Sequence, residues 1–123
     1  MKKHILIIDD EQSLLNSMVR DLRGLNDKYE IYTSINSEDT LELIANYTID
    51  LLITDIFMPE KEGIEIIAEA HKKYPALKII AMSGAGNVHG SSYLDIAIRL
   101  GASNFLNKPF TREELVTAIE SAL

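Results

Sequence analysis

The stretch at residues 49–63, IDLLITDIFMPEKEG, decides the fold of this chain. Its first part, Ile49–Asp55, is nearly continuous in Leu and Ile, which predicts a strand that is buried on both faces. A proline and a glycine then mark a loop, and from Ile64 to about Tyr74 the apolar residues have helical spacing. A doubly buried strand followed by an amphipathic helix is the repeating unit of parallel α/β proteins.

The same unit recurs on both sides of this segment. Short β-branched runs predict four further strands, at His4–Asp9, Tyr29–Ser34, Lys78–Ser83 and Asn104–Asn107. Helical patterns lie between and after them: an apolar stripe from Leu14 to Leu25, a helix capped by Ser37 that runs to about Asn46, a helix from about Ser92 to Leu100 that Gly101 ends, and a last helix opened by the capping box Thr111–Glu114. This strict alternation predicts an α/β fold of the (βα)5 type, a doubly wound parallel sheet with helices on both faces.

Length and composition exclude several classes of protein and of functional site. The 123 residues suit one domain over 1–123, and the absence of Cys excludes a disulfide scaffold, a zinc ribbon, a thiol nucleophile and an iron–sulfur site. A formal charge of −7 disfavours direct contact with nucleic acid or anionic lipid. No uncharged apolar run approaches the roughly 18 residues of a membrane span, so we expect a cytoplasmic domain with no membrane partner.

Polar residues end the predicted strands that form the middle of such a sheet. Asp9 and Asp10 end the first strand, Asp55 the third and Ser83 the fourth, and Lys108 follows the fifth. In a five-stranded sheet of order 2-1-3-4-5 these strands are neighbours, and their carboxyl ends share one rim. We therefore expect three carboxylates, one hydroxyl and one ammonium group to converge there.

This set has a chemical interpretation. Three crowded carboxylates repel one another unless a cation neutralises them, and oxygen ligands suit a hard ion such as Mg²⁺. A phosphoryl group beside that ion would need the positive charge of Lys108 and the hydroxyl of Ser83. Asp55 is central, so one of its oxygens could act as a nucleophile and carry the phosphoryl group as an acyl phosphate.

Four motifs in order resemble the receiver domain of two-component response regulators, of the chemotaxis type, over essentially the full length of the chain. They are ILIIDDE at 5–11, LLITDIFMPEKEG at 51–63, IIAMSG at 79–84 and GASNFLNKPF at 101–110. The resemblance implies a flavodoxin-like fold with strand order 2-1-3-4-5. It also implies that Asp55 is the phosphorylated residue, and that Asp9, Asp10, Asp55 and the backbone carbonyl of Phe57 hold Mg²⁺ or Mn²⁺.

The resemblance assigns roles to three more residues. Lys108, in a Lys-Pro pair that the family usually holds cis, would contact the phosphoryl oxygens, and Ser83 would donate a hydrogen bond to them. Phe105 corresponds to the aromatic switch position, which swings inward when Ser83 is drawn toward the phosphoryl group. Phe57 and Ala85 flank the path of the hydrolytic water in the family; because neither side chain can place water, we expect slow intrinsic dephosphorylation. The glycine-bearing loop Gly84–Gly90 is expected to be mobile and to become ordered on phosphorylation.

The implied partners are a sensor histidine kinase or a histidine phosphotransfer protein as donor, and a downstream protein that contacts the fourth helix, fifth strand and fifth helix. The resemblance leaves open a homodimer that forms on phosphorylation. Such a switch is not an enzyme, because it catalyses only its own phosphorylation and dephosphorylation. The start at Met1 and the complete fifth helix favour a stand-alone regulator.

Three alternatives remain. The chain could be a receiver domain cut from a longer regulator, such as a transcription factor or a hybrid kinase. An Mg²⁺-dependent phosphohydrolase with an Asp nucleophile is a weaker alternative, because the loops are too short to enclose a substrate. An FMN-binding domain is disfavoured by the acidic loop at Asp10 and Glu11, which would repel phosphate.

Overall fold

The computed structural model describes residues 2–25, 27–58, 62–84 and 90–123, with the backbone alone described for residues 90–94. Five strands and five α-helices alternate along the chain. The strands are β1 (Lys3–Ile8), β2 (Tyr29–Ser34), β3 (Leu51–Asp55), β4 (Lys78–Ser83) and β5 (Asn104–Asn107). The α-helices are α1 (Gln12–Leu22), α2 (Thr40–Tyr47), α3 (Gly63–Lys73), α4 (Gly90–Leu100) and α5 (Arg112–Ala122), with 3₁₀ turns η1 (Arg23–Leu25) and η2 (Ser37–Asp39).

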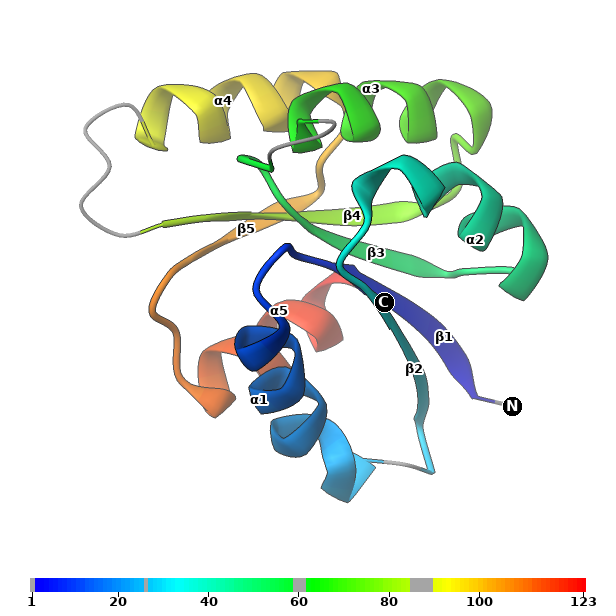
Figure 1. The fold of residues 1–123 in the computed structure, drawn as a ribbon, viewed down its shortest axis with the longest axis vertical. Helices are drawn as coiled ribbons and strands as arrows, with labels where there is room; N and C mark the ends of the chain where they lie inside the picture. Colours follow the sequence, from blue (N-terminus) through cyan, green and yellow to red (C-terminus); the bar gives the residue numbers. More distant parts are fainter. Residues whose placement is uncertain (1, 26, 59–61, 85–89) are drawn as a thin grey trace.

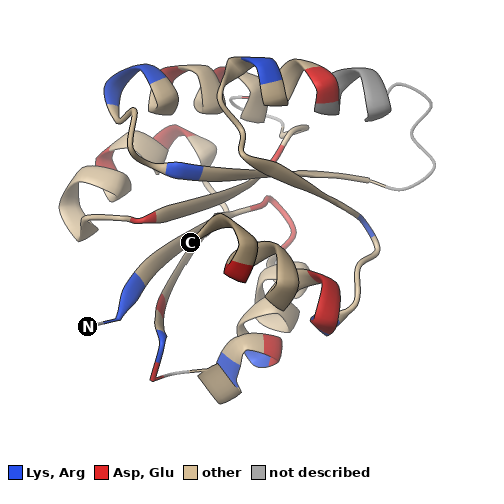
Figure 2. Cartoon of the chain, turned by 180° about the vertical axis from the view of Figure 1, so that it is seen from behind, with Lys and Arg blue, Asp and Glu red and all other residues tan. Residues whose placement is uncertain are grey.

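The strands form one parallel sheet in the order β2-β1-β3-β4-β5. Helices α1 and α5 cover one face, and α2, α3 and α4 cover the other (Figure 1). This is the predicted doubly wound (βα)5 arrangement. In Figure 2 the charged residues mark the helices and the strand ends, and the centre of the sheet is almost free of them.

The sheet has a separate hydrophobic core on each face, because alternate side chains of a strand point in opposite directions. On β1, Leu6 and Ile8 enter the core under α2 and α3, whereas Ile5 and Ile7 enter the core under α1 and α5. Each of these four side chains is fully buried. Burial on both faces explains why the strand sequences are continuous in apolar residues instead of alternating.

Some element boundaries differ from the prediction. Asn36, and not Ser37, caps the turn before α2: its side-chain oxygen accepts a hydrogen bond from the backbone N–H of Glu38, while Ser37 is buried. The apolar stripe that runs to Leu25 includes η1, because α1 ends at Leu22. Asn and Ser are equally good capping residues, so local sequence does not choose between neighbours of this kind.

The end of α4 has the predicted glycine cap. Gly101 has a φ of +131°, and the backbone N–H groups of Gly101 and Ala102 bond to the carbonyls of Ile98 and Ala97. Residues 85–89, which include Ala85, lie outside the described residues. The predictions about the mobility of the Gly84–Gly90 loop and about Ala85 fall on them. Among the helices that the structure describes, none is long and apolar enough to span a bilayer.

Candidate functional site

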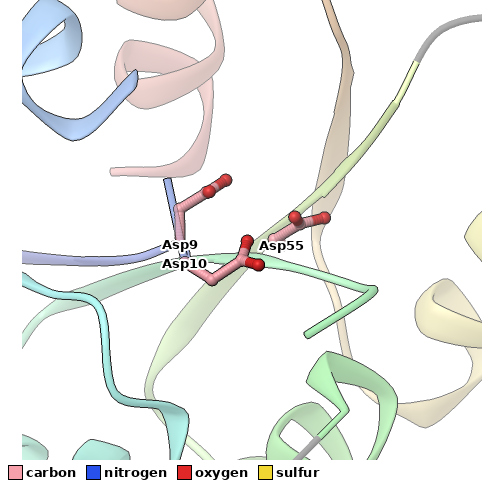
Figure 3. A group of neighbouring side chains, drawn as sticks. All are labelled: Asp9, Asp10 and Asp55. Atoms are coloured by element: carbon pink, nitrogen blue, oxygen red, sulfur yellow. The ribbon is translucent and has the colours of Figure 1, made fainter. Parts of the chain in front are cut away.

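Three carboxylates meet where β1 and β3 end. Asp9 and Asp10 directly follow β1, and Asp55 is the last residue of β3, the strand beside it. Each contributes a carboxylate oxygen to a group in which all these atoms lie within 4.8 Å of one another (Figure 3). Asp9 is fully buried and Asp55 is 6% exposed, whereas Asp10 is exposed, so the group opens to solvent on one side.

Lys108 joins two of these carboxylates from the end of β5. Its Nζ lies 2.7 Å from Asp9 Oδ2 and 3.1 Å from Asp55 Oδ2. The backbone N–H of Lys108 donates to the carbonyl of Ser83 at 2.7 Å, which places the lysine beside the end of β4. The peptide bond between Lys108 and Pro109 is cis, as the resemblance implied.

Burial and neighbouring charges shift the pKa values of Asp55 and Lys108. Burial raises the pKa of Asp55, and the charge of Asp9 raises it further; the charge of Lys108 acts in the opposite direction and does not cancel these effects. Burial by itself would lower the pKa of Lys108, but its hydrogen bond to Asp9 and the charges of Asp55 and Asp9 raise it. Lys108 is therefore a cation at neutral pH. Its charge only partly offsets the effects that raise the pKa of Asp55.

Ser83 lies at the end of β4, next to Asp55. It is 1% exposed, and its Oγ has no hydrogen-bond partner among the described residues. A buried hydroxyl without a partner is unfavourable unless another group completes it, for example an oxygen of a bound anion. Phe105, on β5, is 42% exposed and points away from the core.

Two features near Asp55 were not predicted from the sequence. The backbone N–H of Phe57 donates to Asp55 Oδ1 at 3.3 Å, and the Phe57 ring packs against the core under α2 and α3. Gly63, the first residue of α3, lies against the backbone of Asp55. The glycine eight positions after Asp55 is the sequence signal that could have indicated this contact.

The donor set fits a hard divalent cation. All of its donors are carboxylate oxygens, and Asp10 leaves one side open to the water and phosphate oxygens that complete the coordination of Mg²⁺. The backbone carbonyl of Phe57 follows Asp55 closely in the chain and is the remaining predicted donor.

Comparison with known proteins agrees with this geometry. A family model described as "Response regulator receiver domain" matches residues 5–120. The chain belongs to this family. Receiver domains are signalling switches of two-component systems, and they bind Mg²⁺ through acidic residues such as those gathered here.

Relatives of this receiver domain include longer proteins and solved chains of about its own length. It is 30% identical over 120 residues to response regulator SaeR of Staphylococcus aureus strain USA300. This match covers 98% of this chain and 50% of SaeR. The chain thus spans about half the length of the curated relatives it matches. Among solved structures, a receiver domain protein from Clostridium thermocellum is 32% identical with a TM-score of 0.86, over 98% of this chain and 93% of that one.

A CheY-like receiver domain protein from Methanospirillum hungatei JF-1 gives a similar result. It is 29% identical with a TM-score of 0.85, and the match covers 98% of this receiver domain and 93% of that chain. These likenesses cover the whole sheet and all five helices. They agree with the strand order observed here.

Proposed function

We propose that this receiver domain is a phosphoacceptor switch in which Asp55 receives a phosphoryl group from a phosphohistidine donor in an Mg²⁺-dependent reaction. The observation that carries the proposal is the convergence of Asp9, Asp10, Asp55 and Lys108 at one rim of the sheet. The cation would be held by the three carboxylates and the backbone carbonyl of Phe57. Mn²⁺ would serve in its place, because it accepts the same oxygen ligands.

The transfer needs a nucleophile and positive charge around the phosphoryl oxygens. An oxygen of the Asp55 carboxylate attacks phosphorus and forms the acyl phosphate bond, while the phosphorus–nitrogen bond of the donor breaks and its imidazole leaves with the electron pair and takes up a proton. Lys108 and the divalent cation supply the charge that stabilises this transition state. The Ser83 hydroxyl, buried and without a partner among the described residues, would bond a phosphoryl oxygen.

The signal would leave through the surface formed by α4, β5 and α5. Ile96 and Ile98 on α4 and Phe105 on β5 are each more than 40% exposed. We propose that Phe105 turns inward when Ser83 moves toward the phosphoryl group, so that the surface changes shape for a partner. The partner would be a separate protein, an output domain of a longer regulator, or a second copy of this domain.

Incubation with acetyl phosphate followed by intact-mass measurement tests the proposal. We expect one added phosphoryl group that requires Mg²⁺ and is absent from Asp55→Asn. Asp39→Asn is the matched control, because Asp39 is an exposed aspartate at the start of α2 and should leave the adduct unchanged.

Two results would contradict the proposal: an adduct that survives in Asp55→Asn, or no adduct together with no binding of beryllofluoride, a phosphoryl mimic. Binding of beryllofluoride without an adduct would instead show that the site needs its own phosphohistidine donor. That donor, a sensor histidine kinase or a phosphotransfer protein, would then be sought directly.

A further inference from the structure

We infer that Gly63 is a positioning residue for the phosphoacceptor: it allows the first turn of α3 to touch the backbone of Asp55, and this contact holds the Asp55 carboxylate and the Phe57 carbonyl in place for the cation. The inference deepens the proposed function and rests on it. It adds a residue that binds neither the cation nor the phosphoryl group.

The contact at Gly63 leaves no room for a side chain. A Cβ built on this residue would lie 1.9 Å from the carbonyl oxygen of Asp55 and 2.8 Å from both the carbonyl carbon of Asp55 and the Cα of Ile56. All three neighbours are backbone atoms, so a change of rotamer cannot relieve the overlap. Any residue other than glycine must shift either α3 or the segment that carries Asp55.

The Asp55–Phe57 segment is tied on both sides. The N–H of Gly63 donates to the carbonyl of Ile56 at 2.8 Å, and the N–H of Ile56 donates to the carbonyl of Met82 on β4 at 3.0 Å. Ile56 therefore connects β4 to the start of α3, and it lies between Asp55 and Phe57, two of the four residues proposed to bind the cation. A displacement of Gly63 is transmitted to both.

Helix α3, on the other side of the contact between Gly63 and Asp55, is also held rigidly. Helix α3 buries Ile66, Ile67 and Ala70 completely or almost completely in the core beneath it. Close packing of these side chains resists movement of the helix as a unit. A methyl group at Gly63 is therefore expected to displace the shorter segment, Asp55–Phe57, which leaves the end of β3 and is not part of a packed helix.

The glycines of this chain provide matched controls. Gly63 does not have a positive φ, so alanine is compatible with its backbone conformation and tests the contact alone. A Cβ at Gly24 meets nothing within 4 Å. At Gly101, a Cβ would overlap the ring of His71 near the other end of α3, and the φ of +131° adds strain. Gly63 and His71 are eight residues apart, roughly 12 Å along the helix axis.

The experiment compares three substitutions in the full chain, Gly63→Ala, Gly24→Ala and Gly101→Ala. Mg²⁺ affinity is measured by titration calorimetry, and the rate of phosphorylation by acetyl phosphate is measured at saturating Mg²⁺. We expect Gly63→Ala to weaken Mg²⁺ binding by about 10- to 100-fold, the usual effect of losing a residue that orients metal ligands. It should also slow phosphorylation by up to about 100-fold, because small misplacements of a reacting group have large effects on rate.

Gly101→Ala should lower the melting temperature without changing Mg²⁺ affinity, and Gly24→Ala should change neither. Folded Gly63→Ala protein that binds Mg²⁺ as the wild type does would overturn the inference. So would an equal loss of affinity in Gly101→Ala, because the effect would then follow from general destabilisation.

A second measurement covers the case in which Gly63→Ala does not fold. In wild-type protein, the amide NMR signals of the three glycines are followed during an Mg²⁺ titration. We expect the Gly63 amide to shift and to saturate with the site, while those of Gly24 and Gly101 stay constant; an unmoved Gly63 amide would overturn the inference. Wild-type protein that neither binds Mg²⁺ nor becomes phosphorylated would contradict the proposed function itself, which is a separate outcome.

Discussion

Asp55 is held in the folded domain in surroundings that disfavour its ionised form. Burial and the charge of Asp9 raise the pKa of its carboxyl group above the ordinary value of 3.8, in spite of the ion pair with Lys108. The folded domain thus binds the proton of Asp55 more tightly than the unfolded chain does. As the pH rises through the interval between the two pKa values, the unfolded chain releases this proton first, and the folded state loses stability.

This predicts that Asp55→Asn stabilises the domain at pH 7 in the absence of divalent cations. The gain should be on the order of 1 kcal/mol, the usual size of a single-residue effect. It should shrink as the pH falls below the raised pKa of Asp55 and be smallest below the ordinary value of 3.8. Urea unfolding in EDTA at a series of pH values measures it. A variant that is less stable than wild type at pH 7 would show that the ion pair with Lys108 outweighs burial.

Phe57 bears on the lifetime of the phosphorylated state. Its ring is half-buried against the core under α2 and α3, next to the phosphoacceptor. We predict that Phe57→Asn speeds loss of the phosphoryl group by up to about tenfold, which corresponds to about 1.4 kcal/mol in the barrier, because an amide can place the attacking water.

The decay of the phosphorylated protein, followed by intact mass, measures this effect. Phe57→Leu is the control, because leucine keeps the apolar contact and offers no hydrogen bond to water. Equal acceleration in both variants would assign the effect to lost packing and not to the amide.

At the scale of elements, the connection from β5 to α5 determines where Lys108 lies. The Thr111 side chain accepts from the backbone N–H of Glu114, and the Glu114 carboxylate accepts from the N–H of Thr111. Arg112 Nε also donates to the carbonyl of Asp21 on α1 at 2.9 Å. The start of α5 is thereby fixed a few residues after Lys108.

We predict that Thr111→Ala lowers the free energy of unfolding by about 1 kcal/mol, the usual contribution of an N-cap side chain. Thr117→Ala is the control: Thr117 is exposed inside the same helix, where alanine is the better helix former, so stability should stay constant or rise slightly. Chemical denaturation of both variants measures the difference. Equal effects would mean that the capping box contributes nothing beyond helix propensity.

Periodicity predicted the type and order of every strand and α-helix, but not every end. A short apolar run such as that of β3, followed by a loop with a proline and a glycine, is typical of a strand buried on both faces. The cap before α2 was misassigned by one residue, and η1 was read as part of α1. Asn and Ser cap helices equally well, and a 3₁₀ turn commonly extends the end of an α-helix, so local preference did not decide either boundary.

At the scale of the whole molecule, sheet order creates the site. Lys108 and Asp9 are 99 residues apart in the sequence, yet Nζ and Oδ2 lie 2.7 Å apart. The chain winds outward from β1 in both directions, so the ends of β1, β3, β4 and β5 share one rim. A cation bound at this rim would contact β1 and β3 and so stabilise the sheet as a unit.

We therefore predict that Mg²⁺ at ten times its dissociation constant stabilises the domain by about 1.4 kcal/mol, through preferential binding to the folded state. In a domain of this size the melting temperature should rise by roughly 5 °C. Asp10→Asn should abolish this rise with little change in the cation-free protein, because Asp10 is exposed and lies outside both hydrophobic cores. A full rise in that variant would place the cation elsewhere.

The sequence by itself determined the class of fold, the order of elements and the residues at the strand ends. These properties follow from local patterns: apolar runs, helical spacing and polar residues such as Asp9 and Asp55 where a run stops. Once the parallel arrangement was inferred, the convergence of these carboxylates with Lys108 also followed, because parallel strands end at a common rim.

Only the tertiary structure decided how the site is held. Three relations between distant segments illustrate this. Asp55 is buried enough to raise its pKa, Ser83 Oγ lacks a partner among the described residues, and Gly63 touches the Asp55 backbone. Local sequence does not encode such relations. They depend on the exact separation of packed elements, which is set by the close packing of the whole molecule.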